Sequence, residues 1–177
     1  MNTESAVYQA MRRKLPQVAW QRVENWAGAG VPDVNGAFLW PANGREIGIE
    51  IWCELKVCKT KAYKTKDLWR PAQIAYQTRR SCISDGVWNL VSHPRAELLY
   101  IYSGDKTSGL SIDSTGSTVP DLVLKYKDPW STFLDLAARR ILDGRPIDPT
   151  GSTEPPASTG STESIDPPAK ENPAGAG

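Results

Sequence analysis

The sequence predicts an α/β fold that is followed by a tail without regular structure. Residues 49–57 alternate between apolar and polar side chains, as expected of a strand with one buried face. The Asn43-Gly44 pair just upstream separates this strand from another apolar stretch, a pattern typical of a β-hairpin. Pro71 opens a stretch of helical character, and proline is favoured in the first turn of a helix. Strands and helices therefore alternate along the chain.

Capping residues, prolines and glycines set the bounds of each predicted element. In chain order, we expect first a helix from Glu4 to Leu15, which Pro16 ends, then a strand at 18–26 and the hairpin strands at 34–40 and 45–57. A second helix at 71–84 stops at Asp85-Gly86 and is followed by strands at 87–91 and 97–102. Asp128 and Pro129 cap a last helix that reaches Leu142. The second Val-Pro-Asp triplet, 119–121, is expected to be a turn that leads into another strand.

Composition divides the chain into two parts. Residues 1–145 contain enough apolar side chains to bury a single core, so we expect one folded domain there. Residues 146–177 consist mostly of Pro, Gly, Ser, Thr, Ala and acidic residues. Such a segment cannot bury enough apolar surface to offset its conformational entropy, and we expect it to be disordered.

The last predicted helix carries an apolar stripe. Its members recur at helical spacing: Trp130, Phe133, Leu134, Ala137 and Ile141. Packing of this stripe on the core is the simplest interpretation. A contact between two copies of the chain is the alternative, which would make the protein a homodimer.

Two carboxylates and a lysine mark a candidate catalytic site. Asp33 ends a Val-Pro-Asp triplet, and Glu54 and Lys56 share one face of the predicted strand 49–57. We expect the Glu54 carboxylate and the Lys56 ammonium to lie side by side at an open edge, with the hairpin returning Glu54 towards Asp33. Glu50 lies on the same face but roughly 13 Å along the strand, too far to share an ion, and we expect a supporting role.

These residue types suit metal-dependent hydrolysis of a phosphodiester. Mg²⁺ prefers hard oxygen ligands and keeps several waters, so one or two carboxylates plus a substrate phosphate satisfy it. A bound metal polarises the phosphoryl oxygen and helps to deprotonate water. A solvent-facing ion pair on a strand is the alternative interpretation of Glu54 and Lys56.

The motifs resemble the PD-(D/E)XK nuclease superfamily. The segments 29–33, 53–56 and 71–73 are most similar to VRR-NUC and Holliday-junction-resolvase-type nucleases, many of them from phages. The resemblance covers roughly residues 1–103. It implies a restriction-endonuclease-like αβββαβ core with a mixed central sheet flanked by helices. It also implies Mg²⁺, for which Mn²⁺ can substitute, and DNA as the substrate.

Carried over residue by residue, the resemblance implies a five-residue site: Glu4, Asp33, Glu54, Lys56 and Gln73. Asp33 and Glu54 would bind the metal, and Glu4 would complete or support that shell. Lys56 would orient the attacking water or stabilise the transition state. Alternatives remain for two members. An acidic residue such as Glu4 is favoured in any first helical turn, and Glu24 competes for its role. Gln73 also fits an ordinary helix surface.

Positive charge concentrates next to this site. Eight Lys and Arg side chains lie between Glu54 and Arg80, against two acidic ones, although the net charge of the whole chain is +1. We expect the segment 57–66, together with Arg70 after it, to bind nucleic-acid phosphates. The side chains expected to do so are Lys59, Lys61, Tyr63, Lys64, Lys66 and Arg70. A solvated lysine-rich loop is the alternative.

The function predicted from the sequence is a Mg²⁺-dependent DNA endonuclease that prefers branched or Holliday-junction DNA. A repair or restriction-type nuclease that acts with a partner is the first alternative, and a non-catalytic nucleic-acid-binding module is the second. Three cysteines without metal-finger spacing suit a reducing cytoplasm, that of the host if the protein is viral, and argue against zinc. The polar start of the chain predicts no membrane partner.

Overall fold

A computed structural model describes residues 1–23 and 30–143. Its elements are α1 (Glu4–Lys14), β1 (Ala19–Arg22), β2 (Val34–Ala42), β3 (Arg45–Val57), α2 (Pro71–Ser81), β4 (Val87–His93), β5 (Leu98–Ser103), the short 3-10 helix η2 (Gly104–Lys106), α3 (Thr107–Ile112), β6 (Leu122–Lys125) and α4 (Ser131–Asp143). The predicted order αβββαβ is confirmed, and η2 and α3 are additions that the sequence patterns did not predict.

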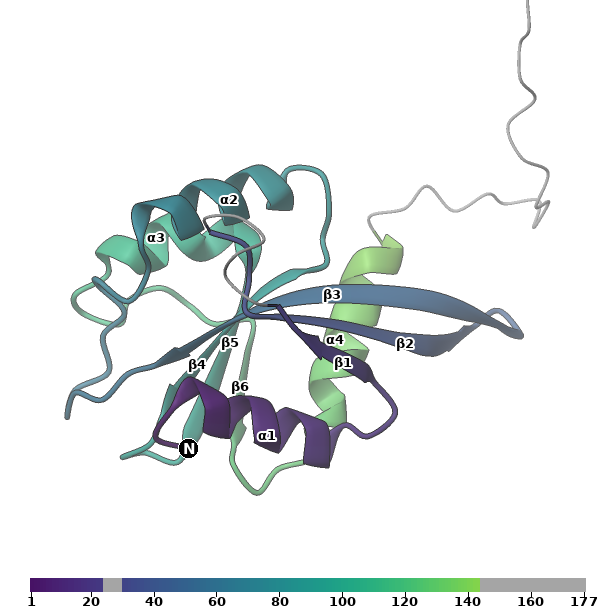
Figure 1. Cartoon of the computed structure of the whole chain (residues 1–177), viewed down its shortest axis with the longest axis horizontal. Coiled ribbons are helices and arrows are strands. Elements are labelled where there is room, and N and C mark those ends of the chain that lie inside the picture. Colours follow the sequence, from purple (N-terminus) through teal and green to yellow (C-terminus); the bar gives the residue numbers. More distant parts are fainter. Residues whose placement is uncertain (24–29, 144–177) are drawn as a thin grey trace, which may run out of the picture. The chain divides into compact units, whose positions relative to one another are not determined.

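The six strands form one mixed sheet in the order β1-β2-β3-β4-β5-β6 (Figure 1). β3 and β4 are parallel, with α2 as the crossover between them, and every other neighbouring pair is antiparallel. The β2–β3 hairpin turns at Asn43 and Gly44, both of which have positive φ. β1 pairs only with residues 34–37 of β2, and β4 only with residues 52–57 of β3, so the far part of the hairpin is two-stranded.

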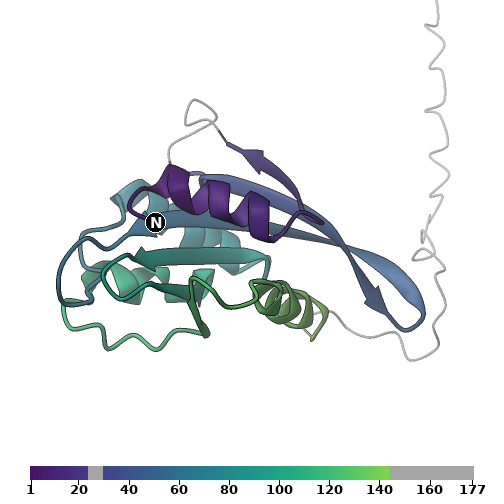
Figure 2. The same ribbon diagram turned by 90° about the horizontal axis from the view of Figure 1, so that it is seen from below.

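Helices cover both faces of the sheet. α1 and α4 lie on one face, and α2 and α3 on the other, as the two views together show (Figures 1 and 2). The larger apolar cluster joins α1 and α4 to the inward side chains of β3, among them Ile51, Cys53 and Leu55. The predicted orientation of these three side chains is therefore confirmed, and Val57 is half-buried.

The apolar stripe of the last helix belongs to the core. Trp130, Phe133, Leu134 and Ala137 are all buried, and Trp88 of β4 packs edge-on against Phe133 with ring centroids 5.5 Å apart. These side chains are thus not available as a dimer contact.

Asp128 does not cap the last helix as predicted. Its carboxylate accepts a hydrogen bond from the Lys125 amide at 2.8 Å, so it closes the turn after β6, and α4 begins only at Ser131. The turn-then-strand prediction for the second Val-Pro-Asp triplet is confirmed by β6.

Two predictions concern residues outside the described ranges. Glu24, the competitor of Glu4, belongs to the undescribed segment 24–29, and the predicted disordered tail, 146–177, lies after residue 143. Among the described residues, no helix is long and apolar enough to cross a membrane.

Candidate active site

Glu54 lies at the centre of the candidate site. β3 is an interior strand between β2 and β4, and the Glu54 side chain is fully buried. Lys56 is two residues further along the same face, and its Nζ lies 2.6 Å from Glu54 Oε1. The prediction of an ion pair is right, but the prediction of an open edge is wrong, because β4 pairs in parallel with this part of β3 and α2 covers the face.

Asp33 approaches the same strand from the start of β2. Its Oδ2 accepts a hydrogen bond from the Leu55 amide at 2.9 Å. Leu55 follows Glu54 directly, so the Asp33 carboxylate lies beside the backbone that carries Glu54. The hairpin therefore brings the two carboxylates together, as predicted.

Gly30 fixes the path of the chain just before Asp33. Its φ is +90°, and a Cβ at this position would lie 2.2 Å from the Ala72 carbonyl oxygen. Only glycine permits both the conformation and the close approach. The segment that ends in Pro32 and Asp33 is thus pressed against the first turn of α2.

That first turn of α2 carries Gln73, the fourth residue of the candidate site. Its Nε2 donates a hydrogen bond to Glu54 Oε1. Its Oε1 accepts a hydrogen bond from the Arg70 amide at 3.0 Å, at the N-terminal end of the helix. Both ends of the amide are therefore engaged, and the interpretation of Gln73 as an ordinary surface residue is wrong.

Glu4 borders the site from the start of α1. Its Oε1 lies 3.9 Å from Lys56 Nζ, and its side chain is about half exposed. Lys56 thus faces two carboxylates, Glu54 closely and Glu4 more loosely. Burial, followed by the negative charge of Asp33, raises the pKa of Glu4, while Lys56 lowers it.

The pKa of Glu54 is raised to about 7. Burial is the largest cause, and the negative charge of Asp33 adds to it. The charge of Lys56 and its hydrogen bond act in the opposite direction but do not compensate. Two close carboxylates in a buried place form a site where a cation would be stabilised.

The donor set fits a hard divalent metal. Glu54 Oε2 is buried and has no hydrogen-bond partner among the described residues, so one oxygen of the deepest carboxylate is left for a ligand. Within residues 1–23 and 30–143, no group of three or more His, Cys, Asp or Glu side chains has metal-binding geometry. Mg²⁺ needs only one or two carboxylates, and Asp33 and Glu54 supply two.

The basic segment between β3 and α2 is anchored to the rest of the protein. The Thr65 and Lys66 amides donate to the Asp113 carbonyl, at 3.1 and 2.8 Å, and Thr65 Oγ1 donates to the Leu110 carbonyl at 2.7 Å. The Asp113 carboxylate accepts bonds from the amides of residues 115–118. The loop 113–118 therefore holds the basic segment in place.

Most of the predicted phosphate-binding side chains are exposed: Lys59, Lys61, Lys64, Lys66 and Arg70. Tyr63 differs from them. Its ring stacks on Tyr100 with centroids 4.0 Å apart, and its hydroxyl is 2.8 Å from that of Tyr102. Tyr63 thus packs inward and supports the segment, and its contact with nucleic acid stays a prediction.

A cleft lies between Glu4 and Lys56 of the candidate site and the basic segment. Its volume is about 360 Å³, and its lining includes Glu4, Lys56, Lys59 and Asp67. Its walls come from α1, the end of β3 and the basic segment, so a phosphate bound there would meet the ammonium groups of Lys56 and Lys59.

Sequence reasoning missed two residues that shape this site. Gly30 belongs to the segment 29–33 that carries the resemblance, but nothing in the sequence indicates its contact with Ala72. Asp113 begins an Asp-Ser-Thr-Gly run, which is a recognisable signal for side-chain-to-backbone hydrogen bonds in a turn. This run predicts that the Asp113 side chain bonds to the backbone that follows it, as the structure shows.

No protein-family model matches the chain, and no curated protein matches it. Among solved structures, the chain is similar to Hjc, a Holliday junction resolvase from the archaeal hyperthermophile Archaeoglobus fulgidus, with a TM-score of 0.37 and 14% sequence identity. The match covers 76% of this chain and 92% of Hjc. A likeness of this size is a loose one.

Proposed function

We propose that the protein is a Mg²⁺-dependent nuclease that hydrolyses phosphodiester bonds in DNA. The observation that carries this proposal is the convergence of Asp33, Glu54 and Lys56, with one Glu54 oxygen buried and unpartnered among the described residues. Two carboxylates this close repel one another without a cation. A merely structural ion pair does not require the second carboxylate.

Each side chain has a role in this proposal. Asp33 and Glu54 would hold the metal, which would polarise the phosphoryl group and lower the pKa of a bound water. The Lys56 ammonium, fixed against Glu54 at 2.6 Å, lies where it can stabilise negative charge that develops on the phosphate. Gln73 is a positioning residue, because it holds Glu54 and the start of α2 together.

We further propose that the substrate is branched DNA, such as a Holliday junction, and that a second copy of the chain or another partner takes part. The cysteines and the one histidine have no zinc-finger spacing that would read base sequence. The exposed lysines beside the cleft suit the phosphate backbone, which carries no sequence information. The shape of the substrate would then supply the selectivity.

The test is a substrate panel with the full chain. Labelled linear duplex, single strand, flap and four-way junction are each incubated with Mg²⁺, Mn²⁺ or EDTA, alongside Asp33→Asn. We expect metal-dependent cutting that the variant loses and that is fastest on the junction. Equal cutting by Asp33→Asn would refute the site. DNA binding without cutting under every condition would favour a non-catalytic binding module or a nuclease that requires a partner protein.

A further inference from the structure

A second cavity opens beside the active-site cleft and shares one lysine with it. Its volume is about 530 Å³, and Asn2, Lys59, Pro94 and Arg95 line it. Lys59 also lines the cleft that contains Glu4 and Lys56. The two cavities are thus neighbours, with Lys59 on their common border.

The parallel pairing of β3 and β4 explains why these residues meet. Parallel neighbours end at the same edge of a sheet, so the segment after Val57 and the turn after His93 come out side by side. Lys59 lies in the first of these and Arg95 in the second. Both side chains are exposed.

Hydrogen bonds fix the three segments that line this cavity. The Cys58 amide donates to the Ser92 carbonyl at 2.8 Å, and His93 Nε2 lies 3.1 Å from the Thr60 carbonyl oxygen. Lys59 therefore lies between two residues that β4 holds. Ser92 Oγ donates to the Met1 carbonyl at 2.8 Å, which places Asn2 on the same rim.

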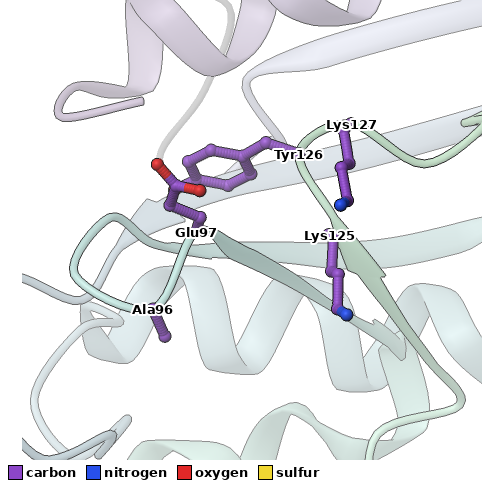
Figure 3. A pocket seen from close by; sticks show the side chains of 5 residues that line it. All are labelled: Ala96, Glu97, Lys125, Tyr126 and Lys127. Atoms are coloured by element: carbon purple, nitrogen blue, oxygen red, sulfur yellow. The ribbon is translucent and has the colours of Figure 1, made fainter.

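A further cavity near the 94–97 turn has an acidic side chain in its lining as well as two lysines. Ala96, Glu97, Lys125, Tyr126 and Lys127 line it (Figure 3). The Glu97 carboxylate lies beside the Tyr126 ring in this view, away from the two lysine ammonium groups. The cavity at Lys59 and Arg95 has two cations and no acidic side chain in its lining.

We propose that Asn2, Lys59 and Arg95 form a subsite for a phosphate of the nucleic-acid strand, next to the phosphate that is cut. This inference rests on the proposed function, because the cleft with Lys56 defines where the cut phosphate lies. Arg95 presents a planar guanidinium that can bind two phosphate oxygens at once, and Lys59 adds a point charge. The Asn2 amide can donate a further hydrogen bond. The strand would therefore pass from the cleft over Lys59 to Arg95.

The test compares two arginine variants of the full chain, Arg95→Gln and Arg45→Gln. Each removes one exposed positive charge in or beside a turn. Arg45 is at the first position of β3, and Val57 is at the last, so the control lies about 40 Å from the subsite. Binding to a labelled DNA duplex is measured in EDTA over a series of salt concentrations.

We expect Arg95→Gln to weaken binding and to reduce the slope of log K against log salt by about 0.9. Arg45→Gln should leave the slope unchanged, and Lys59→Gln combined with Arg95→Gln should reduce it by about 1.8. If Arg95→Gln matches the wild type, the subsite is refuted. Melting curves of each variant check that the fold is intact.

Shortening the DNA from either end gives a second readout. On a four-way junction the branch point fixes where the protein binds, and the subsite lies to one side of the cut phosphate. The effect of Arg95→Gln on binding to the junction should therefore vanish when its strands are shortened from one end and persist when they are shortened from the other. An equal effect at both ends would contradict the placement. These binding measurements need no cutting. If the protein never cuts DNA, the proposed nuclease activity is refuted, and the subsite can still be tested by binding.

Discussion

The Asp33 carboxylate accepts a hydrogen bond of 2.9 Å from the Leu55 amide, which connects the residue just before β2 to the last part of β3, two residues from the end of that strand. One oxygen of Asp33 is therefore used to hold the backbone. The carboxylate has a structural task in addition to the catalytic one that we propose, and the two can be separated by substitution.

The variants Asp33→Asn and Asp33→Ala separate the structural task of the Asp33 carboxylate from its proposed catalytic one. Asparagine keeps an oxygen that can accept the Leu55 bond, whereas alanine leaves that amide without its partner. We expect both variants to lose cutting, but only Asp33→Ala to lower the free energy of unfolding, by about 1–3 kcal/mol. Urea denaturation and a cleavage assay measure the two effects. A large loss of stability in Asp33→Asn would show that the negative charge, and not the acceptor, holds Leu55.

Metal affinity should depend on pH through Glu54. A metal binds the deprotonated carboxylate, and the pKa of Glu54 is about 7 because burial and Asp33 disfavour its charged form. Affinity should thus be nearly constant above pH of about 8 and fall by roughly tenfold per pH unit below pH of about 7. Titration calorimetry with Mn²⁺ at a series of pH values, from mildly acidic to mildly alkaline, measures this dependence. Equal affinity at mildly acidic and alkaline pH would contradict the proposed role of Glu54 as a ligand.

Gly30→Ala should damage both the fold and the site. The added Cβ would meet the Ala72 carbonyl, and the positive φ is unfavourable for alanine. We expect the free energy of unfolding to fall by about 2 kcal/mol or more, with a loss of cutting because Asp33 shifts. Gly48→Ala is the matched control, since nothing lies within 4 Å of a Cβ at that position. It should be neutral or slightly stabilising, and similar melting curves for the two variants would argue against a tight contact at Gly30.

The exposed lysines of the basic segment should contribute to binding and not to chemistry. Replacing Lys61, Lys64 and Lys66 together by glutamine removes three charges from an anchored surface. If all three contact phosphates, the slope of log K against log salt should fall by about 2.7. The cutting rate at saturating DNA should stay close to that of the wild type. An unchanged slope of log K against log salt would show that these lysines do not contact the DNA phosphates.

The sequence predicted the elements that obey local rules. Alternation in β3, the Asn43-Gly44 turn and the proline at the start of α2 each depend on a few neighbouring residues, and each prediction is confirmed. The pairing of strands is a different matter. That β4 lies beside β3, which turns a predicted open edge into a buried interior, depends on contacts between residues more than thirty positions apart.

In the candidate site, too, some contacts could be predicted from the sequence and others depend on how distant parts of the chain pack together. The motifs predicted that Asp33, Glu54 and Lys56 would come together. The resemblance also placed Gln73 in the site, but not its bond to Glu54. The motifs contained no sign that Gly30 would touch α2, because that contact depends on how α2 docks on the sheet. The narrower similarity to VRR-NUC enzymes rests on the sequence motifs alone.

Gln73 closes the first turn of α2 with its oxygen and holds Glu54 with its nitrogen. Fraying of that turn would consequently break the contact between Gln73 and Glu54, so the opening of the helix end and the loss of this contact are one equilibrium. The Ile74 amide, which bonds to the Arg70 carbonyl at 3.1 Å, exchanges its hydrogen with solvent only when the turn opens. Its exchange rate would therefore report what fraction of molecules lacks the contact between Gln73 and Glu54 at any moment.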